Sequence, residues 1–197
     1  MTRRKLIFAS NNEHKLAELR QIAGEKYEIL SLNDIGCHDD IPETAPTLEG
    51  NALMKAQWVR EHYGVDCFSD DTGLEIDALG GEPGVHSARY SGEPVNSERN
   101  IDKVLRLMKD VPQERRTAHF RTVIVLLIGD EMHTFEGRVD GHILTERHGE
   151  GGFGYDSIFQ PIEADVTFAQ MTAAQKNAIS HRGRAVARLM QFLNCEQ

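Results

Sequence analysis

The chain alternates between short apolar runs and stretches in which apolar residues recur every three or four positions, a pattern that predicts strands and helices together. Residues 5–9 favour a strand, and residues 16–23 favour a helix that follows it after a polar turn. Thr47 and Ser97 are placed to cap two further helices, and a last helix is predicted over 180–193.

The middle of the chain predicts the rest of a sheet. Residues 67–71 and 74–78 favour two strands bent around Thr72 and Gly73. Residues 123–128 are apolar without interruption, as in a strand covered on both faces, whereas 135–143 alternate between apolar and polar residues, as in a half-solvated strand. Together these elements predict an α/β fold with a mixed sheet and flanking helices.

Length and composition narrow the class of protein. A chain of 197 residues that is 40% hydrophobic can bury its own core, so we expect one domain over 1–197. No window approaches the roughly 20 apolar residues of a membrane-spanning helix, and we expect a cytoplasmic protein. A net charge of −9 disfavours binding to membranes and to nucleic-acid polymers. Cys37, Cys67 and Cys195 match no zinc or disulfide spacing, and idle thiols explain them.

The first candidate site lies where the first strand leads into the first helix. Backbone N–H groups at a helix N-terminus attract anions, and asparagine amides and a lysine in the first turn add donors. The segment therefore predicts a phosphate-binding loop, with an ordinary asparagine cap beside a solvated lysine as the alternative. Its residues are Ser10, Asn11, Asn12, Glu13, His14 and Lys15.

Charged residues further along are candidates for catalysis. Lys55 shares the buried face of a predicted helix, so it either extends its ammonium group to water or points it into a cavity that holds an anion. Asp70 and Asp71 end an apolar strand, and because side chains alternate along a strand, only one should ligate a metal or activate water. Both could instead cap a turn. Glu43 is a candidate partner carboxylate, since Mg²⁺ typically takes one or two protein carboxylates.

A glycine-rich run and a later group of donors suit a pocket for a base. In GGFGYDSIF the glycines permit close approach to a flat ligand, while Phe153 or Tyr155 supplies a stacking face. Lys176 precedes a helix start at which His181 and Arg182 supply donors in one place. The alternative is a glycine loop with core aromatic residues and a His-Arg pair beside a helix cap.

Five segments occur in order along the chain: SNNEHK, the acidic loop before TLEGNALMKA, FSDDTGLEIDALGGEPGVHSARYSG, GGFGYDSIF and QKNAISHRG. Together they resemble the inosine triphosphatase family of non-canonical purine NTP pyrophosphatases, and they span nearly the whole chain, from Ser10 to Gly183. The first segment reads Ser-Asn-Asn where many relatives have Thr-Gly-Asn, and Ser157 stands where a proline is common. Neither difference removes a charged group.

The resemblance implies an elongated α/β fold with two lobes around a central nucleotide-binding cleft, and a homodimer. It also implies magnesium-dependent hydrolysis of ITP, dITP or XTP to the monophosphate and pyrophosphate, which cleanses the nucleotide pool. By position, Glu43 and Asp71 would hold the metal and Asp71 would accept a proton from water, while Lys15 and Lys55 can stabilise the developing charge. The implied substrate contacts are Ser10 to Lys15 for the triphosphate; Thr72; Phe153, Gly154, Tyr155 and Asp156 for the base and sugar; and Lys176, His181 and Arg182 for the base edge.

Two other functions remain open at this point. A Maf-type nucleotide pyrophosphatase has a related architecture, but the His181-Arg182 helix start argues against it. A purine nucleotide sensor without turnover would not require Asp71 or Lys55, so pyrophosphate release from ITP with magnesium would distinguish an enzyme from a sensor.

Overall fold

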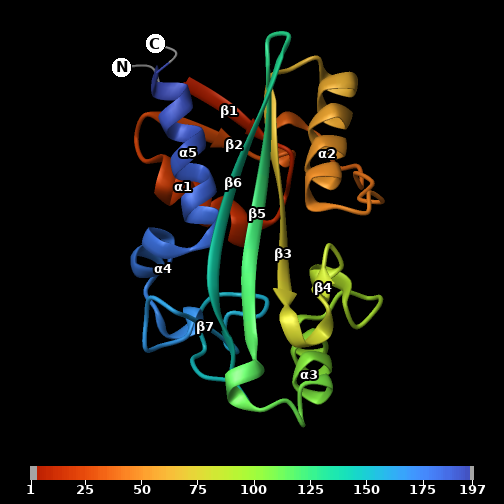
Figure 1. Ribbon diagram of the computed structural model, residues 1–197. Helices are drawn as coiled ribbons and strands as arrows, with labels where there is room; N and C mark the ends of the chain where they lie inside the picture. The colour runs from red at the N-terminus through yellow and green to blue at the C-terminus, as the bar shows by residue number, and fades with distance from the viewer. Residues whose placement is uncertain (1–3, 196–197) are drawn as a thin grey trace. The chain divides into compact units, whose positions relative to one another are not determined.

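The structure, a computed structural model, describes residues 4–195 and has a mixed α/β fold (Figure 1). In chain order, its α-helices and strands are β1 Arg4–Phe8, α1 Glu13–Ala23, β2 Tyr27–Leu30, α2 Leu48–Tyr63, β3 Cys67–Ile76, β4 Pro83–Gly84, α3 Ser97–Leu107, β5 Thr117–Ile128, β6 Glu131–Ile143, β7 Phe159–Pro161, α4 Ala173–Ile179 and α5 His181–Cys195.

The sheet combines parallel and antiparallel pairing, which confirms the predicted mixed sheet. Among the described residues the strand order is β2-β1-β3-β5-β6-β7, and β4 pairs with β3. β1 runs parallel to both β2 and β3, whereas β4 runs antiparallel to β3 and β7 runs antiparallel to β6. Gly129, at φ 53°, begins the short turn that joins the neighbouring strands β5 and β6 in a hairpin.

The contacts divide the chain into two compact units. Unit 1 takes the residues up to Asp71, Thr122–Gly137 and the residues from Arg182 onward, and unit 2 takes Thr72–Arg121 and Arg138–His181. The strands β3, β5 and β6 therefore contribute residues to both units. The single folding unit expected from the length stays a prediction. Between residues 4 and 195, no helix combines the length and the apolar character that crossing a membrane requires.

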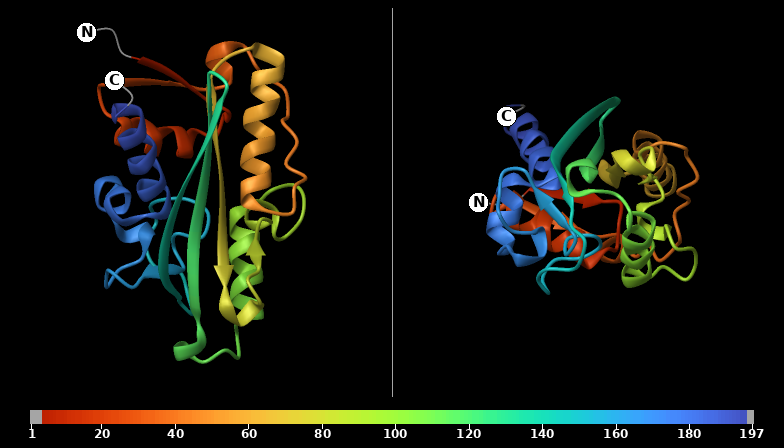
Figure 2. Two further views of the ribbon diagram at one scale, coloured as in Figure 1. Left: turned by 45° about the horizontal axis from the view of Figure 1, so that its top comes forward. Right: turned by 60° about the horizontal axis from the view of Figure 1, so that its bottom comes forward.

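In unit 1, β5 is covered on both faces. Ile124 and Leu126 pack in a core cluster with residues of α1 and α5, whereas Val125 and Leu127 pack in a second cluster with residues of α2. Figures 1 and 2 show α1 and α5 on one side of the unit 1 strands and α2 on the other. The uninterrupted apolar run is thus explained, because successive side chains of a strand point to opposite faces and both faces are dry.

In unit 2, the core joins α3 to the sheet. Ile101 and Val104 of α3 belong to one buried cluster with Phe120 of β5 and Val139 of β6. Beside this cluster, Arg116 is buried, and burial lowers the pKa of its guanidinium. Its N–H groups donate at 2.7–3.2 Å to the backbone carbonyl oxygens of Met108, Val111, Ile143 and Leu144. The guanidinium therefore ties the segment after α3 to the end of β6.

Two local predictions were wrong. β3 is one continuous strand, not two strands bent around Thr72, because its second half continues the sheet by pairing with β4. The helix cap predicted at Ser97 is instead Asn96, whose side-chain oxygen accepts the Arg99 N–H at 2.9 Å. Asparagine is an equally favourable cap, so the side chain one position earlier was available for the role. The cap at Thr47 is confirmed.

Candidate active site

The loop between β1 and α1 is held in shape by its own side chains. Asn12 caps α1, because its Oδ1 accepts the Lys15 N–H at 3.1 Å, and Ser10 Oγ accepts the Asn12 N–H at 3.1 Å. Asn11 Oδ1 accepts the Asn33 N–H at 2.7 Å. The predicted strand-turn-helix placement is confirmed, whereas phosphate binding by this loop stays a prediction. Exposed residues of the loop and first turn are Asn12, Glu13 and His14.

Asp70 lies at the centre of a buried ion-pair network in unit 1. Its Oδ1 accepts from Lys15 Nζ at 2.6 Å, and its Oδ2 accepts from Arg182 Nε at 3.1 Å. Arg182 Nη1 donates in turn to Glu18 Oε2 at 2.5 Å. Only 1% of the Asp70 side chain and 2% of the Arg182 side chain are exposed. Burial opposes the charged form of Asp70, but Lys15 and Arg182 outweigh it and hold the pKa of Asp70 well below its usual range.

Asp71 points to the other face of β3, toward α2. Asn51 Nδ2 donates to Asp71 Oδ2 at 3.1 Å, and Lys55 Nζ lies 3.7 Å from Asp71 Oδ1. The same ammonium group donates to Glu43 Oε1 at 2.5 Å. Only 7% of the Lys55 side chain is exposed, so its head group lies among carboxylates and does not extend to water. Asp70 and Asp71 thus have different partners on different faces, as strand alternation predicts.

The pKa values of three groups in this network are shifted for separate reasons. Burial raises the pKa of Asp71, and the nearby lysines only partly offset that effect. Burial lowers the pKa of Lys15. Burial also opposes the charged form of Lys55, but Asp71 and Glu43 outweigh it and raise the pKa of Lys55. A carboxylate with a raised pKa is a better proton acceptor, which suits Asp71 to activate water.

Glu43 and Asp71 fit a hard divalent cation. Both carboxylates approach Lys55 Nζ, so their oxygen atoms border one small region. Within the described part of the chain, no three His, Cys, Asp or Glu side chains are grouped as a metal site. A cation held here would therefore take most of its ligands from water and phosphate, which is typical of Mg²⁺ and not of a structural zinc ion. Magnesium binding stays a prediction.

The glycine-rich loop of unit 2 forms a turn around Asp156. Asp156 Oδ2 accepts the Phe153 N–H at 2.9 Å and a hydrogen bond from Lys176 Nζ at 2.6 Å. Gly152 has φ 69°, and a Cβ at this position would lie 2.1 Å from Asp156 Oδ2, so a larger residue does not fit. Lys176 Nζ also lies 4.7 Å from the centroid of the Phe153 ring, a cation–π contact. The predicted Phe153, Asp156 and Lys176 are therefore brought together, beside the half-buried Gly154.

Two other predicted contacts are core residues of unit 2. The Tyr155 ring is buried and its hydroxyl donates to a backbone carbonyl oxygen at 2.8 Å, so of the two alternatives for a stacking face Phe153 is the more accessible, and substrate contact by Tyr155 stays a prediction. The buried His181 ring stacks on Phe120 with centroids 4.5 Å apart, whereas Arg182 joins the Asp70 network of unit 1. Recognition of the base edge by His181 and Arg182 stays a prediction.

Sequence reasoning missed two polar members of the unit 1 network. Glu18 lies three positions after Lys15, and Asn51 lies four positions before Lys55, so each shares a helix face with its lysine. A search for polar residues three or four positions from each candidate lysine would have found both. Thr72, the remaining predicted contact, is half-buried in β3 immediately after the carboxylates.

The fold and this group of residues have counterparts among known proteins. Residues 6–192 match the Ham1 family, and the chain belongs to it. The dITP/XTP pyrophosphatase of Porphyromonas gingivalis is 54% identical over 191 residues, which cover 97% of this chain and 98% of that protein. The solved structure of the Staphylococcus aureus Ham1 protein has a TM-score of 0.88 at 37% identity and covers 98% of this chain and 100% of its own. That of the nucleoside-triphosphatase / dITP/XTP pyrophosphatase from Mycobacterium abscessus has a TM-score of 0.76 at 42% identity and covers 94% and 98%. The family resemblance drawn from the sequence is confirmed.

Proposed function

We propose that this chain hydrolyses non-canonical purine nucleoside triphosphates, namely ITP, dITP and XTP, to the monophosphate and pyrophosphate. The names of its relatives support this activity, because the relatives align with this chain over almost their whole length. The observation that carries the proposal is the buried Asp71, whose pKa is raised by burial and whose carboxylate is contacted by Lys55 and Asn51. A protein that only sensed nucleotides would not need a buried proton acceptor, so this arrangement favours an enzyme.

The proposed reaction is the attack of water on the α-phosphorus. The water oxygen forms a bond to phosphorus while the bond to the oxygen between the α and β phosphates breaks, and pyrophosphate leaves with that electron pair. Asp71 accepts the proton of the attacking water. The ammonium groups of Lys15 and Lys55 stabilise the charge that builds on the phosphate oxygens. An ammonium group has three N–H donors, so the hydrogen bond from Lys15 to Asp70 orients the group and leaves two donors for phosphate oxygens.

Glu43 and Asp71 are the residues we propose to hold Mg²⁺. When bound, the ion supplies positive charge that neutralises the departing pyrophosphate. Lys55 connects this pair to the reaction, because its ammonium group contacts both carboxylates and keeps them in one region.

The base is proposed to bind against Phe153 in unit 2. Lys176 is oriented by Asp156 and by the Phe153 ring, which places a cation beside the stacking surface. A 6-keto purine offers an acceptor where adenine offers an amino donor, so donors from His181 or Arg182 would favour 6-keto purines such as hypoxanthine and xanthine over adenine. The biological role we propose is removal of deaminated purine nucleotides from the cytoplasmic pool by a homodimer, the assembly that light scattering coupled to size-exclusion chromatography tests.

A panel assay tests the proposal directly. ITP, dITP, XTP, ATP and GTP are incubated with the protein with and without Mg²⁺, and pyrophosphate and orthophosphate are measured separately. We expect pyrophosphate from the three deaminated substrates, only with the metal. Stepwise release of orthophosphate would contradict the reaction, and tight ITP binding without turnover would establish the sensor instead.

A further inference from the structure

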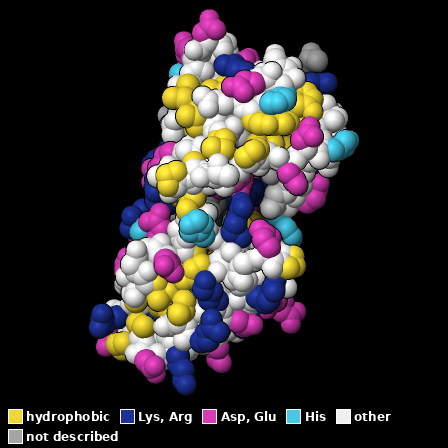
Figure 3. Space-filling view, turned by 90° about the vertical axis from the view of Figure 1, so that its right-hand side faces the viewer, with side chains coloured by type: hydrophobic (Ala, Val, Ile, Leu, Met, Phe, Trp, Pro, Cys, Tyr) yellow, Lys and Arg dark blue, Asp and Glu magenta, His cyan; other side chains and the backbone are white. Residues whose placement is uncertain are grey.

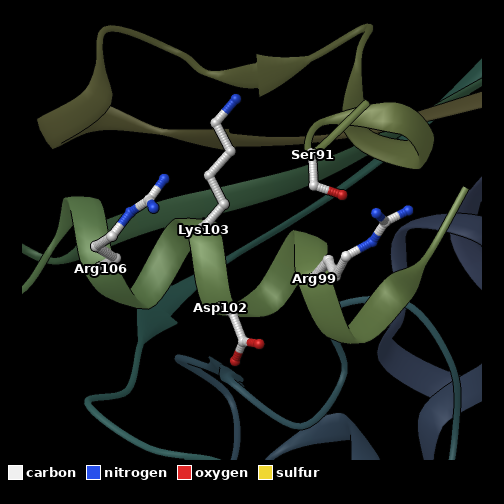
Figure 4. Close-up of a pocket in the computed structure, with 5 residues that line it drawn as sticks. All are labelled: Ser91, Arg99, Asp102, Lys103 and Arg106. Carbon is white, nitrogen blue, oxygen red and sulfur yellow. The ribbon is translucent and has the colours of Figure 1, made fainter. Parts of the chain in front are cut away.

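One side of α3 in unit 2 carries three cations. Arg99, Lys103 and Arg106 are spaced four and three positions apart, which places them on one helix face. Figure 4 shows their side chains extending from the same side of α3, while Asp102 points to the other side. Lys and Arg side chains also gather in the lower half of Figure 3. Like charges at this spacing destabilise a helix, and their clustering in a chain of net charge −9 requires a physical reason.

The three cations are not neutralised by carboxylates within residues 4–195. Arg99 Nη2 donates to the Pro94 carbonyl oxygen, and Lys103 Nζ donates to the Tyr90 carbonyl oxygen at 2.6 Å. The same ammonium group lies 3.8 Å from the Tyr90 ring centroid. These neutral contacts hold Arg99 and Lys103 in place and leave the positive charge of the stripe unbalanced.

The cations line a pocket of about 460 Å³, together with Ser91 and Asp102. The charge of Asp102 is balanced by Arg147, whose Nη2 lies 2.8 Å away. Ser91 Oγ is buried and has no hydrogen-bond partner in the part of the chain that the structure describes. Buried hydroxyl groups are rarely left unpaired, so Ser91 is an observation independent of the charges that also indicates a bound group.

We propose that this pocket binds a small polyanion with at least two phosphate groups. Its volume lies in the range of small-molecule sites. Phosphate oxygens accept from guanidinium, ammonium and hydroxyl donors at once, and three cations match a diphosphate better than a single carboxylate. None of the lining residues belongs to the catalytic group proposed above, so the pocket and the reaction can fail independently.

Amide chemical shifts of ¹⁵N-labelled protein, titrated with inorganic pyrophosphate without metal, test the proposal. We expect saturable chemical-shift changes at the amides of Ser91 and of residues 99–106. Binding at the proposed catalytic site in unit 1 would instead shift amides near that site. Arg99→Ala and Arg106→Ala should each raise the Kd at these amides about tenfold, the loss of one charge-assisted hydrogen bond. Arg115→Ala removes an exposed arginine of the same unit outside the pocket and should leave the Kd unchanged.

Arg106→Ala tests the pocket without disturbing the fold. The Arg106 side chain makes no hydrogen bond or ion pair within the described residues, so Arg106→Ala should fold normally, which circular dichroism verifies. A second titration, with ADP, distinguishes two possible ligands that carry a diphosphate group. Tighter binding of ADP would identify a nucleoside diphosphate as the ligand, and tighter binding of pyrophosphate would identify the free anion. No saturable shift at these amides, or a Kd that Arg106→Ala leaves unchanged, would overturn the proposal.

Discussion

Replacing Asp70 with asparagine should reduce stability, whereas replacing the adjacent Asp71 should abolish turnover and leave the protein folded. Asp70→Asn removes the charge that lies between Lys15 and Arg182, which would both remain largely buried, so we expect the fold to lose stability. Asp71→Asn removes the proposed proton acceptor while Lys55 keeps its other carboxylate at 2.5 Å, so we expect a folded protein without turnover.

The distances from Asp70 to its two cations indicate how much more stability Asp70→Asn should lose than Asp71→Asn. At 2.6 Å from Lys15 Nζ and 3.1 Å from Arg182 Nε, an effective dielectric constant of about 20 gives Asp70 an attraction of roughly 5–6 kcal/mol to each cation. Much of this offsets the desolvation of the charges, and removing one partner of a buried pair costs about 3–5 kcal/mol. For a chain of this length, that corresponds to a fall in Tm of roughly 6–20 °C. Burial raises the pKa of Asp71, so its site tolerates a neutral group, and Asp71→Asn should cost no more than about 1–2 kcal/mol.

The pH dependence of stability is a second measure of Asp70. Its pKa in the folded protein is depressed below the ordinary value of 3.8. Its ionised carboxylate therefore contributes stability above the ordinary pKa, and this contribution is lost as the pH falls through that value toward the folded pKa. The gap in unfolding free energy between the wild type and Asp70→Asn should be complete at pH 7 and should shrink below about pH 4.

Urea denaturation followed by circular dichroism gives the free energy of unfolding, and pyrophosphate release from ITP gives turnover. The wild type and both variants are compared in each assay. Equal stability losses in Asp70→Asn and Asp71→Asn would refute the assignment of the two carboxylates to different faces. Normal turnover in a folded Asp71→Asn protein would refute the role of Asp71 as proton acceptor.

Two further predictions concern local features. Gly152→Ala should be at least about 1 kcal/mol more destabilising than Gly154→Ala in urea, because both glycines have a positive φ but only at position 152 would a Cβ meet Asp156 Oδ2. Equal losses would show that backbone conformation alone decides. Iodoacetamide should alkylate the exposed Cys195 first, since burial raises the pKa of Cys67 to about 11 and keeps it a thiol. Mass spectrometry of the native protein would contradict this if Cys67 reacted as quickly.

Prediction from sequence succeeded where the structural property depends on a short stretch of chain. The apolar run of β5 indicated a strand that is buried on both faces, and Thr47 was identified as a helix cap. It failed at β3, where Thr72 and Gly73 were interpreted as a bend between two strands. The second half of β3 is kept extended by its pairing with Pro83–Gly84 of β4, and no pattern within β3 itself reports that partner.

The sequence by itself determined the α/β class, the family, the glycine-rich segment GGFGYDSIF as a candidate site, and the presence of Lys55 on a buried helix face. These properties follow from periodicity, capping and motif order, which act over a few residues. Only the tertiary structure decided which charges meet. Asp70 finds Lys15 and Arg182, 55 and 112 positions away, because β3 lies between α1 and α5 on one face and α2 on the other. In unit 2, a separate core that includes residues of α3 buries Tyr155, whereas Phe153 stays half-exposed, since the depth of an aromatic ring depends on the elements that cover it and not on its own neighbours in the chain.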